Sequence, residues 1–218
     1  MKTKICGITR RDDLTICEQE DVDLIGFINI PRSPRYVKLN EICDLASSMD
    51  NRNKAVLVTE SDDTSEIQRA IDETGISFVQ LHSLDINGIR EIQRNNPEIK
   101  IIKAVGISET MDDHKIREIE SYSKICQYLI FDSEIKGRSG GTGKQIPLNL
   151  AVKASEIASK NDKGLKLILA GGINANRMKD EGKMLEKYFQ YVDVNSGVEE
   201  GPGVKSKAKI KEFLEVMK

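Results

Sequence analysis

The sequence predicts an α/β protein that forms a single (β/α)8, or TIM, barrel over residues 1–218. Three observations favour this fold class. Eight short apolar segments alternate with eight longer segments of helical periodicity, and that number of βα units closes a barrel. The short segments are largely apolar, as strands covered on both faces are. Glycines and polar residues follow several of them directly, where barrel enzymes carry their active sites.

The expected strands are the runs of β-branched and other apolar residues at Thr3–Cys6, Leu24–Ile28, Lys54–Val58, Phe78–His82, Lys100–Val105, Tyr128–Asp132, Lys166–Ala170 and Tyr191–Asn195. The expected helices have isoleucines and leucines three and four residues apart and lie at Arg11–Glu20, Asn40–Ser48, Thr64–Thr74, Ile86–Asn95, Asp112–Ser123, Leu148–Ser159, Ala175–Lys187 and Lys205–Met217. Asn40, Asp63 and Asn174 are expected to cap helix starts. Strand–helix alternation also fits a doubly wound open sheet, which is the structural alternative.

The composition is that of an ordinary globular domain, with 39% apolar and 31% charged residues. A formal net charge of -2 gives no reason to expect nucleic acid or an anionic membrane as a partner. No stretch approaches the roughly 18 apolar residues of a membrane span. Charges interrupt the N-terminal segment before a signal peptide could form, so we expect a cytoplasmic protein.

Four cysteines are spread along the chain at Cys6, Cys17, Cys43 and Cys126. None forms a CxxC pair, and no cysteine–histidine cluster has the spacing of a zinc site. We expect free thiols in a reducing compartment and no metal. Buried packing is the usual role of such a cysteine.

Polar and glycine residues collect at the carboxyl ends of the expected strands, which should meet at one rim of the barrel. Gly171-Gly172 and the Ser196-Gly197 pair each follow a buried strand and precede a helix. Glycine lets backbone N–H groups approach a ligand, and helix N-termini favour anions. The two loops therefore predict a phosphate site; as isolated turns, the glycines would need no such explanation.

Cys6 and Asp132 end the strands expected first and sixth, so their side chains should face one another across the barrel mouth. A thiolate beside basic groups is a competent base, and a carboxyl in a partly desolvated pocket can act as an acid. Taken alone, Cys6 is better explained as a packing residue and Asp132 as a hydrogen-bonding residue at a strand end. Their shared position beside the phosphate loops makes the pair interesting.

Two further polar residues, Arg35 and His82, have two explanations each. Arg35 suits a planar carboxylate, although a solvated loop arginine is commoner. His82 fits a site residue or a core histidine equally well, whereas His114 fits an exposed helix start. The run Ser139–Lys144 lacks the GxxxxGK[ST] spacing of a nucleotide-binding loop.

Seven motifs resemble the phosphoribosylanthranilate isomerase family, in order and over nearly the whole chain. They are KICGIT at Lys4–Thr9, PRSPRY at Pro31–Tyr36, VQLH at Val79–His82, IKAVG at Ile102–Gly106, GGTGK at Gly140–Lys144, LAGGIN at Leu169–Asn174 and VDVNSGVE at Val192–Glu199. The first and last together are highly specific.

The resemblance implies an Amadori rearrangement of N-(5-phosphoribosyl)anthranilate in tryptophan biosynthesis, with no cofactor and no metal. It places the general base on Cys6 and the general acid on Asp132, and it assigns Arg35 to the anthranilate carboxylate. His82 and Asp193 match positions near the substrate. Phosphate contacts carry over to a set of four residues: Gly171, Gly172, Ser196 and Gly197.

The chain departs from the family pattern at three positions: Ser83 replaces a glycine, Asn195 a serine and Ser206 an acidic residue. The aromatic-rich segment that often follows GGTGK is also absent. Two alternatives remain: another phosphosugar isomerase or epimerase, and a non-catalytic phosphoribosyl-binding barrel. We expect a small-molecule substrate and either a monomer or a homodimer.

Overall fold

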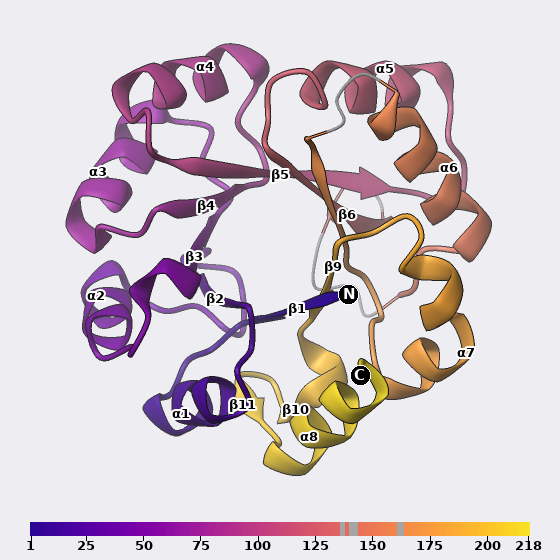
Figure 1. Cartoon of the computed structure of the whole chain (residues 1–218). Helices are drawn as coiled ribbons and strands as arrows, with labels where there is room; N and C mark the ends of the chain where they lie inside the picture. The colour runs from indigo at the N-terminus through magenta and orange to yellow at the C-terminus, as the bar shows by residue number, and fades with distance from the viewer. Residues whose placement is uncertain (136–137, 140–143, 161–163) are drawn as a thin grey trace.

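A closed barrel of eight parallel strands organises the molecule, and helices surround it (Figure 1). The computed structural model describes residues 1–135, 138–139, 144–160 and 164–218. The barrel strands are β1 (Lys2–Cys6), β2 (Leu24–Ile28), β3 (Ala55–Thr59), β4 (Phe78–Leu81), β5 (Lys100–Ile107), β6 (Tyr128–Ile135), β8 (Lys166–Leu169) and β9 (Tyr191–Val194). The helices are α1 (Arg11–Gln19), α2 (Leu39–Ser47), α3 (Thr64–Thr74), α4 (Ile86–Asn95), α5 (Asp113–Tyr122), α6 (Leu148–Ser159), α7 (Ala175–Leu185) and α8 (Lys207–Val216).

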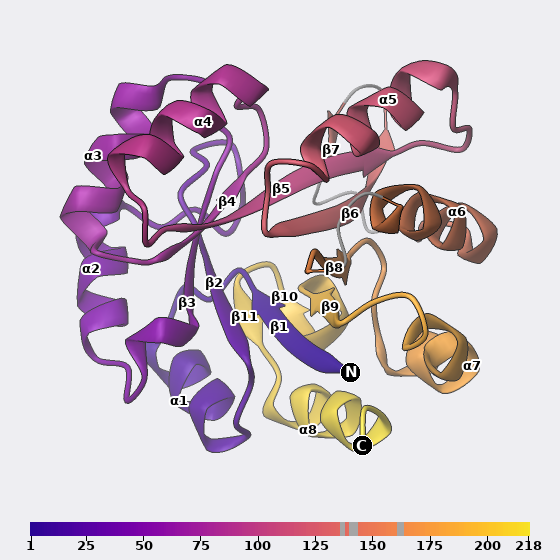
Figure 2. The same ribbon diagram turned by 45° about the horizontal axis from the view of Figure 1, so that its top comes forward.

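Two pairings decide between a barrel and an open sheet. β1 pairs with β2 and also with β9, while β5 pairs with β6, so the ring of strands has no free edge. The predicted (β/α)8 barrel is therefore confirmed, and the doubly wound alternative is wrong. Figure 2 shows the helices outside the strands from a second direction and the two termini near one another.

The strands and helices begin at the expected residues or within two residues of them. Asp63 and Asn174 cap α3 and α7 through their side-chain oxygens, as expected. The expected cap at Asn40 is wrong, because α2 starts one residue earlier and its N-cap is Lys38. There the carboxylate of Glu41 accepts from the Lys38 backbone N–H at 3.1 Å, so the helix start is stabilised from within the first turn.

Five short elements had no counterpart in the sequence prediction. They are two 3₁₀ turns, η1 (Arg52–Lys54) and η2 (Ser196–Val198), the strand β7 (Arg138–Ser139) and a hairpin of β10 (Glu199–Gly201) with β11 (Val204–Lys205). The hairpin takes up Lys205, the first residue of the last expected helix, and Ser206 becomes the N-cap of α8. This difference affects the site, as described below.

Side-chain alternation divides the core into two layers. Along each strand, successive side chains point to opposite faces. On β1, Ile5 belongs to the layer between strands and helices, whereas Cys6 belongs to the layer inside the barrel. On β6, Phe131 packs outward and Ile130 inward, so Asp132 at the next inward position reaches the barrel mouth. Strand periodicity thus selects the side chains that face the cavity.

None of the helices in the part of the chain that the structure describes is long and apolar enough to cross a membrane.

Candidate active site

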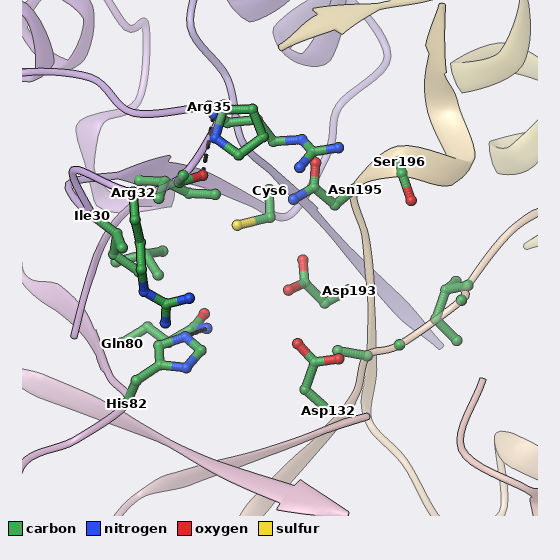
Figure 3. A pocket seen from close by; sticks show the side chains of 18 residues that line it. Cys6, Ile30, Arg32, Arg35, Gln80, His82, Asp132, Asp193, Asn195 and Ser196 are labelled. Carbon is green, nitrogen blue, oxygen red and sulfur yellow. Dashed lines mark hydrogen bonds between the residues drawn. The ribbon is translucent and has the colours of Figure 1, made fainter. Parts of the chain in front are cut away.

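A cavity of about 400 Å³ opens at the carboxyl ends of the barrel strands. Figure 3 shows Cys6, Asp193 and Asp132 along one side of it, with Arg32 and His82 across from them. The lining side chains come from seven loops or strand ends: Cys6, Ile28, Ile30, Arg32, Ser33, Pro34, Arg35, Val58, Gln80, His82, Asp132, Ala170, Gly171, Gly172, Ile173, Asp193, Asn195 and Ser196. All but one of the predicted site residues are among them; the exception is Gly197.

Cys6 lies against a buried ion pair. The Lys4 ammonium donates to Asp193 Oδ2 at 2.9 Å, and both side chains are buried inside the barrel. A Cβ on Gly26 of the neighbouring strand would lie 2.8 Å from Cys6 Sγ and 3.3 Å from Lys4 Nζ. The missing side chain at Gly26 therefore leaves the space in which thiol and ammonium pack side by side.

The charge state of Cys6 follows from this environment. Burial raises the pKa of the Cys6 thiol above its ordinary value, and Asp193 acts in the same direction. Lys4 and Lys205 lower the pKa but do not outweigh burial. The basic neighbours that the sequence led us to expect are present, yet they limit the rise in pKa and do not reverse it.

Asp132 has the protonation behaviour of an acid that works near neutrality. Burial and, second, the negative charge of Asp193 raise the pKa of Asp132 to about 6. The backbone N–H of Ser133, 2.7 Å from Asp132 Oδ1, and the Lys4 ammonium act against that rise. The carboxyl thus keeps its proton to a much higher pH than an exposed aspartate does.

The glycine loop after β8 packs directly beside Asp132. Gly171 and Gly172 have φ values of 77° and 63°, in the left-handed region that favours glycine. A Cβ on Gly171 would lie 3.1 Å from Asp132 Oδ1, and one on Gly172 would lie 2.4 Å from Cγ of Gln145. The buried guanidinium of Arg177 in α7 holds this loop by donating to the carbonyls of Gly171, at 2.9 Å, and of Ile146, at 2.7 Å.

The second glycine loop follows β9 and touches the first. Ser196 lines the cavity and begins η2, whereas Gly197 does not line it. A Cβ on Gly197 would lie 2.1 Å from the carbonyl oxygen of Ile173, so glycine is required there for the two loops to meet. The phosphate expectation for Gly197 thus concerns its backbone at the junction of the loops. Residues 140–143 of the GGTGK motif lie outside the described residues.

Arg35 reaches the cavity rim with the Nε–Nη2 edge of its guanidinium already occupied. Its Nε donates to Glu199 Oε1 at 2.8 Å and its Nη2 to Glu199 Oε2 at 2.6 Å, and both side chains are buried. The methylene stem of Arg35 crosses Gly7, where a Cβ would lie 2.7 Å from Cδ. The predicted carboxylate-binding arginine is therefore present at the cavity, held by a carboxylate of the protein itself.

His82 is a neutral cavity residue at ordinary pH. Burial and, second, the charge of Lys103 lower the pKa of His82 to about 4. Gln80 Nε2 lies 3.1 Å from His82 Nε2, so the ring nitrogen accepts from the amide. Lys103 holds the backbone of the same residue, donating to the His82 carbonyl at 2.6 Å. His114 lies exposed in the first turn of α5, as expected.

Sequence reasoning missed several residues that build the site. Gln80, Asn195 and Arg32 line the cavity, and Glu199 and Lys205 lie behind Arg35. Gln80 and Asn195 lie within the family motifs, so the sequence carried a signal for them. Glu199 ends the last of these motifs, but no pattern along the chain indicated its partner Arg35. Lys205 had no such signal, because it was expected to begin the last helix.

Among the described residues, no group of three or more histidine, cysteine, aspartate or glutamate side chains is arranged to hold a metal ion.

The closed barrel and its cavity define the class of protein: a (β/α)8-barrel enzyme with a thiol and a carboxyl on one cavity, beside two glycine loops. The family model for N-(5'-phosphoribosyl)anthranilate (PRA) isomerase matches residues 3–216. The chain therefore belongs to the phosphoribosylanthranilate isomerase family, and it is an isomerase of tryptophan biosynthesis.

Individual relatives agree over nearly full length. The N-(5'-phosphoribosyl)anthranilate isomerase of Methanothermobacter marburgensis is 36% identical over 219 residues, which cover 98% of this chain and 93% of the relative. The crystal structure of the Thermus thermophilus enzyme is 25% identical, covers 100% of this chain and 98% of its own, and has a TM-score of 0.81. A further isomerase structure, solved in complex with reduced 1-(o-carboxyphenylamino)-1-deoxyribulose 5-phosphate, is 24% identical, with a TM-score of 0.78 and coverage of 99% and 97%.

Proposed function

We propose that Cys6 is the general base and Asp132 the general acid for the Amadori rearrangement of N-(5-phosphoribosyl)anthranilate to 1-(o-carboxyphenylamino)-1-deoxyribulose 5-phosphate. The observation that supports this proposal is that the two side chains share one cavity and have shifted pKa values. Both side chains face one cavity; burial raises the pKa of Asp132 to about 6 and also raises the pKa of the Cys6 thiol, and the charge of Lys4 opposes both rises. Groups with distinct proton affinities on one cavity suit acid–base catalysis.

The first step belongs to Asp132. Its carboxyl donates a proton to the furanose ring oxygen, the C1–O bond breaks, and the anthranilate nitrogen supplies the electron pair of the new C=N bond. A group whose pKa lies near 6 both holds a proton and releases it readily near neutral pH.

The second step belongs to Cys6. The cationic C=N group acidifies the proton on sugar C2, and the thiolate removes it to give an enolamine. The enolamine then loses its hydroxyl proton and gains one at C1, which gives the aminoketone product. The substrate provides its own electron sink, so the proposed route uses no metal and no organic cofactor. Each proton transfer contributes a rate acceleration of about 10²–10⁴.

Binding is divided among the remaining cavity residues. Backbone N–H groups of Gly171, Gly172, Ser196 and Gly197 would hold the phosphate, because these loops meet beside the start of α7. Arg35 would bind the anthranilate carboxylate. His82 and Asp193 would contact the substrate between these two ends.

Two buried acceptors support contacts to the sugar. Gln80 Oε1 and Asp193 Oδ1 are buried atoms without a hydrogen-bond partner among the described residues, and both side chains line the cavity. A buried acceptor without a partner costs about 1–3 kcal/mol, which a donor on the ligand would recover. The hydroxyls of a pentose are suitable donors.

The test follows the fluorescence of the anthranilate substrate as purified protein is added. We expect the signal to decay with the wild type. Cys6→Ala and Asp132→Asn should each lower kcat at least about 100-fold. Both variants should retain their affinity for reduced 1-(o-carboxyphenylamino)-1-deoxyribulose 5-phosphate, an analogue of the product. No decay with the wild type would reject the reaction; near-normal kcat in either variant would reject that residue's role.

The alternative of another phosphosugar isomerase or epimerase predicts a different result. Such an enzyme would bind sugar phosphates lacking the aromatic ring as well as it binds the anthranilate compound. Arg35→Ala should instead weaken binding of the anthranilate compound much more than binding of a simple sugar phosphate. A non-catalytic phosphoribosyl-binding barrel would need neither Cys6 nor Asp132.

We further propose that the chain acts as a single catalytic domain in the cytoplasm, as a monomer or a homodimer. The cysteines of the described residues are free thiols, which suits a reducing compartment.

A further inference from the structure

We propose that Glu199 and Lys205 are positioning residues for carboxylate recognition: they hold Arg35 so that its outer nitrogen, Nη1, faces the substrate. This inference rests on the proposed function and adds two residues to it. The cluster consists of Arg35, Glu199, Lys205 and Asn195, called the Arg35 cluster below.

Glu199 is fixed from several sides. Its Oε1 accepts from Arg35 Nε at 2.8 Å, from Lys205 Nζ at 2.9 Å and from the backbone N–H of Gly203 at 3.3 Å, and its Oε2 accepts from Arg35 Nη2 at 2.6 Å. The hairpin pairing of β10 with β11 places Glu199 directly opposite Lys205. A carboxylate with this many donors is a fixed support for the guanidinium, and a ligand would not readily displace it.

The hairpin that carries Glu199 and Lys205 is hydrogen-bonded to the loop that follows Cys6. Thr9, three residues after Cys6, donates from Oγ1 to the carbonyl of Gly203 at 2.6 Å. The Arg35 stem crosses Gly7 on the same loop. These contacts fix the position of Arg35 and of the β10–β11 hairpin relative to Cys6. The proposed base and the carboxylate-binding group therefore stay at a fixed distance from one another.

The pairing leaves one end of the guanidinium for a ligand. Glu199 occupies the Nε–Nη2 edge, and Nη1 makes no hydrogen bond with any part of the chain that the structure describes. Arg35 lines the cavity, and Figure 3 shows its guanidinium beside Asn195 at the cavity rim. The substrate carboxylate would then be met end-on by Nη1, not by the two-nitrogen fork.

The charge balance of the Arg35 cluster matches one carboxylate. Lys205 Nζ donates to Glu199 Oε1 at 2.9 Å, to Asn195 Oδ1 at 2.9 Å and to the Asn195 carbonyl at 3.2 Å; three acceptors require the protonated ammonium. Two cations and one carboxylate leave a surplus of one positive charge in a buried place. One anionic group on the ligand neutralises that surplus.

The departure from the family at Asn195 fits this arrangement. Its side-chain oxygen is one of the three acceptors around Lys205, and its carbonyl is another. Asn195 thereby fixes the ammonium against Glu199.

The experiment compares two probes: reduced 1-(o-carboxyphenylamino)-1-deoxyribulose 5-phosphate and the corresponding phenylamino compound without the carboxyl group. Wild-type protein should bind the carboxyl-bearing probe at least about tenfold more tightly. Glu199→Gln should remove most of that preference while changing the affinity for the carboxyl-free probe less than about twofold, and KM should rise more than kcat falls. Glu200→Gln, one residue along the same strand and exposed, is the matched control and should behave as the wild type.

The sign of the effect separates positioning from simple attraction. Glu199→Gln makes the cluster more positive, so attraction alone predicts tighter binding of the anionic probe, whereas loss of positioning predicts weaker binding. Tighter binding, or equal losses for both probes, would overturn the proposal. Should Glu199→Gln fail to fold, Glu199→Asp serves in its place: it keeps the charge but withdraws the carboxylate from Arg35, so positioning predicts a reduced preference for the carboxyl-bearing probe and attraction alone predicts no change.

The outcomes also separate this proposal from the proposed function. A wild type that isomerises the substrate but binds both probes equally would overturn the role of the Arg35 cluster and leave the reaction intact. A wild type that does not isomerise the substrate would reject the reaction itself.

Discussion

The ammonium of Lys4 lies 2.9 Å from Asp193 Oδ2 inside the barrel, with Lys4 fully buried and Asp193 8% exposed. This ion pair connects the two groups proposed for proton transfer. Lys4 packs beside Cys6, and the negative charge of Asp193 raises the pKa of Asp132. The pair thus contributes to the proton affinities of both groups.

Removing one member of this pair should be costly. Lys4→Met leaves the Asp193 carboxylate buried without its partner, for which we expect a loss of about 3–5 kcal/mol in the free energy of unfolding. Lys4→Met combined with Asp193→Leu should recover much of that loss. Lys2→Met, on the same strand but exposed, is the control. Urea unfolding measures all four proteins; a loss below about 1 kcal/mol for Lys4→Met would contradict this account.

Asp132 should lower stability at neutral pH. Its folded-state pKa of about 6 lies above the ordinary value of 3.8, so the folded state binds the proton more tightly and stability falls as the pH rises through this range. The full cost above pH 6 is about 2–3 kcal/mol. Asp132→Asn should therefore be more stable than the wild type at pH 8, by an amount that shrinks towards zero below about pH 4. Equal differences at both pH values would contradict burial of the charge.

The profile of kcat/KM against pH should change slope near pH 6, with a plateau above that pH and a fall below it. The active form needs protonated Asp132 and deprotonated Cys6. Below about pH 6, Asp132 is already protonated and each further unit of pH only removes thiolate, so the rate falls tenfold per unit. Between that pH and the raised pKa of Cys6, gain of thiolate and loss of acid cancel, which gives a plateau. A steady rise from pH 6 to pH 8 would contradict the assignment of Asp132 as the acid.

Gly26 should be required for placing the thiol. In Gly26→Ala the new Cβ lies 2.8 Å from Cys6 Sγ and 3.2 Å from its Cα, so the base must shift. Displacement of a reacting group by about 1 Å can cost 100-fold, and we expect a fall in kcat of about 10–100-fold. Gly182→Ala in α7 is the control, since its Cβ meets only Met178 Cε at 3.4 Å. Unchanged kcat in Gly26→Ala would show that the thiol tolerates movement.

Arg177 should support phosphate binding without touching the ligand. Arg177→Met leaves the carbonyls of Gly171 and Ile146 without this donor, at a cost of about 1–3 kcal/mol in stability. The loosened loop should raise the Kd for inorganic phosphate and raise KM more than it lowers kcat. Lys179→Met, exposed on the same helix, should change neither. Unaltered phosphate affinity in a folded Arg177→Met protein would exclude the support role.

The positions of the strands and helices are determined by neighbouring residues and can be predicted from the sequence. Apolar runs and helical periodicity located the strands and helices, because alternation on strands and the 3.6-residue repeat on helices depend only on neighbouring residues. The same alternation placed Cys6 and Asp132 at strand ends facing inward. The family motifs supplied the reaction, and glycine at Gly171 and Gly172 indicated backbone that only glycine adopts readily.

Only the tertiary structure decided the partners and proton affinities of these residues. Arg35 meets Glu199 across 164 residues of chain, and Lys4 meets Asp193 across 189, so no local pattern could predict either pair. The pKa values of Cys6 and Asp132 depend on burial by strands from all parts of the chain. Burial and Coulomb interactions depend on residues that are close in space but distant in the chain, whereas strand and helix patterns depend on neighbouring residues. For this reason the fold could be predicted from the sequence and the electrostatics of the site could not.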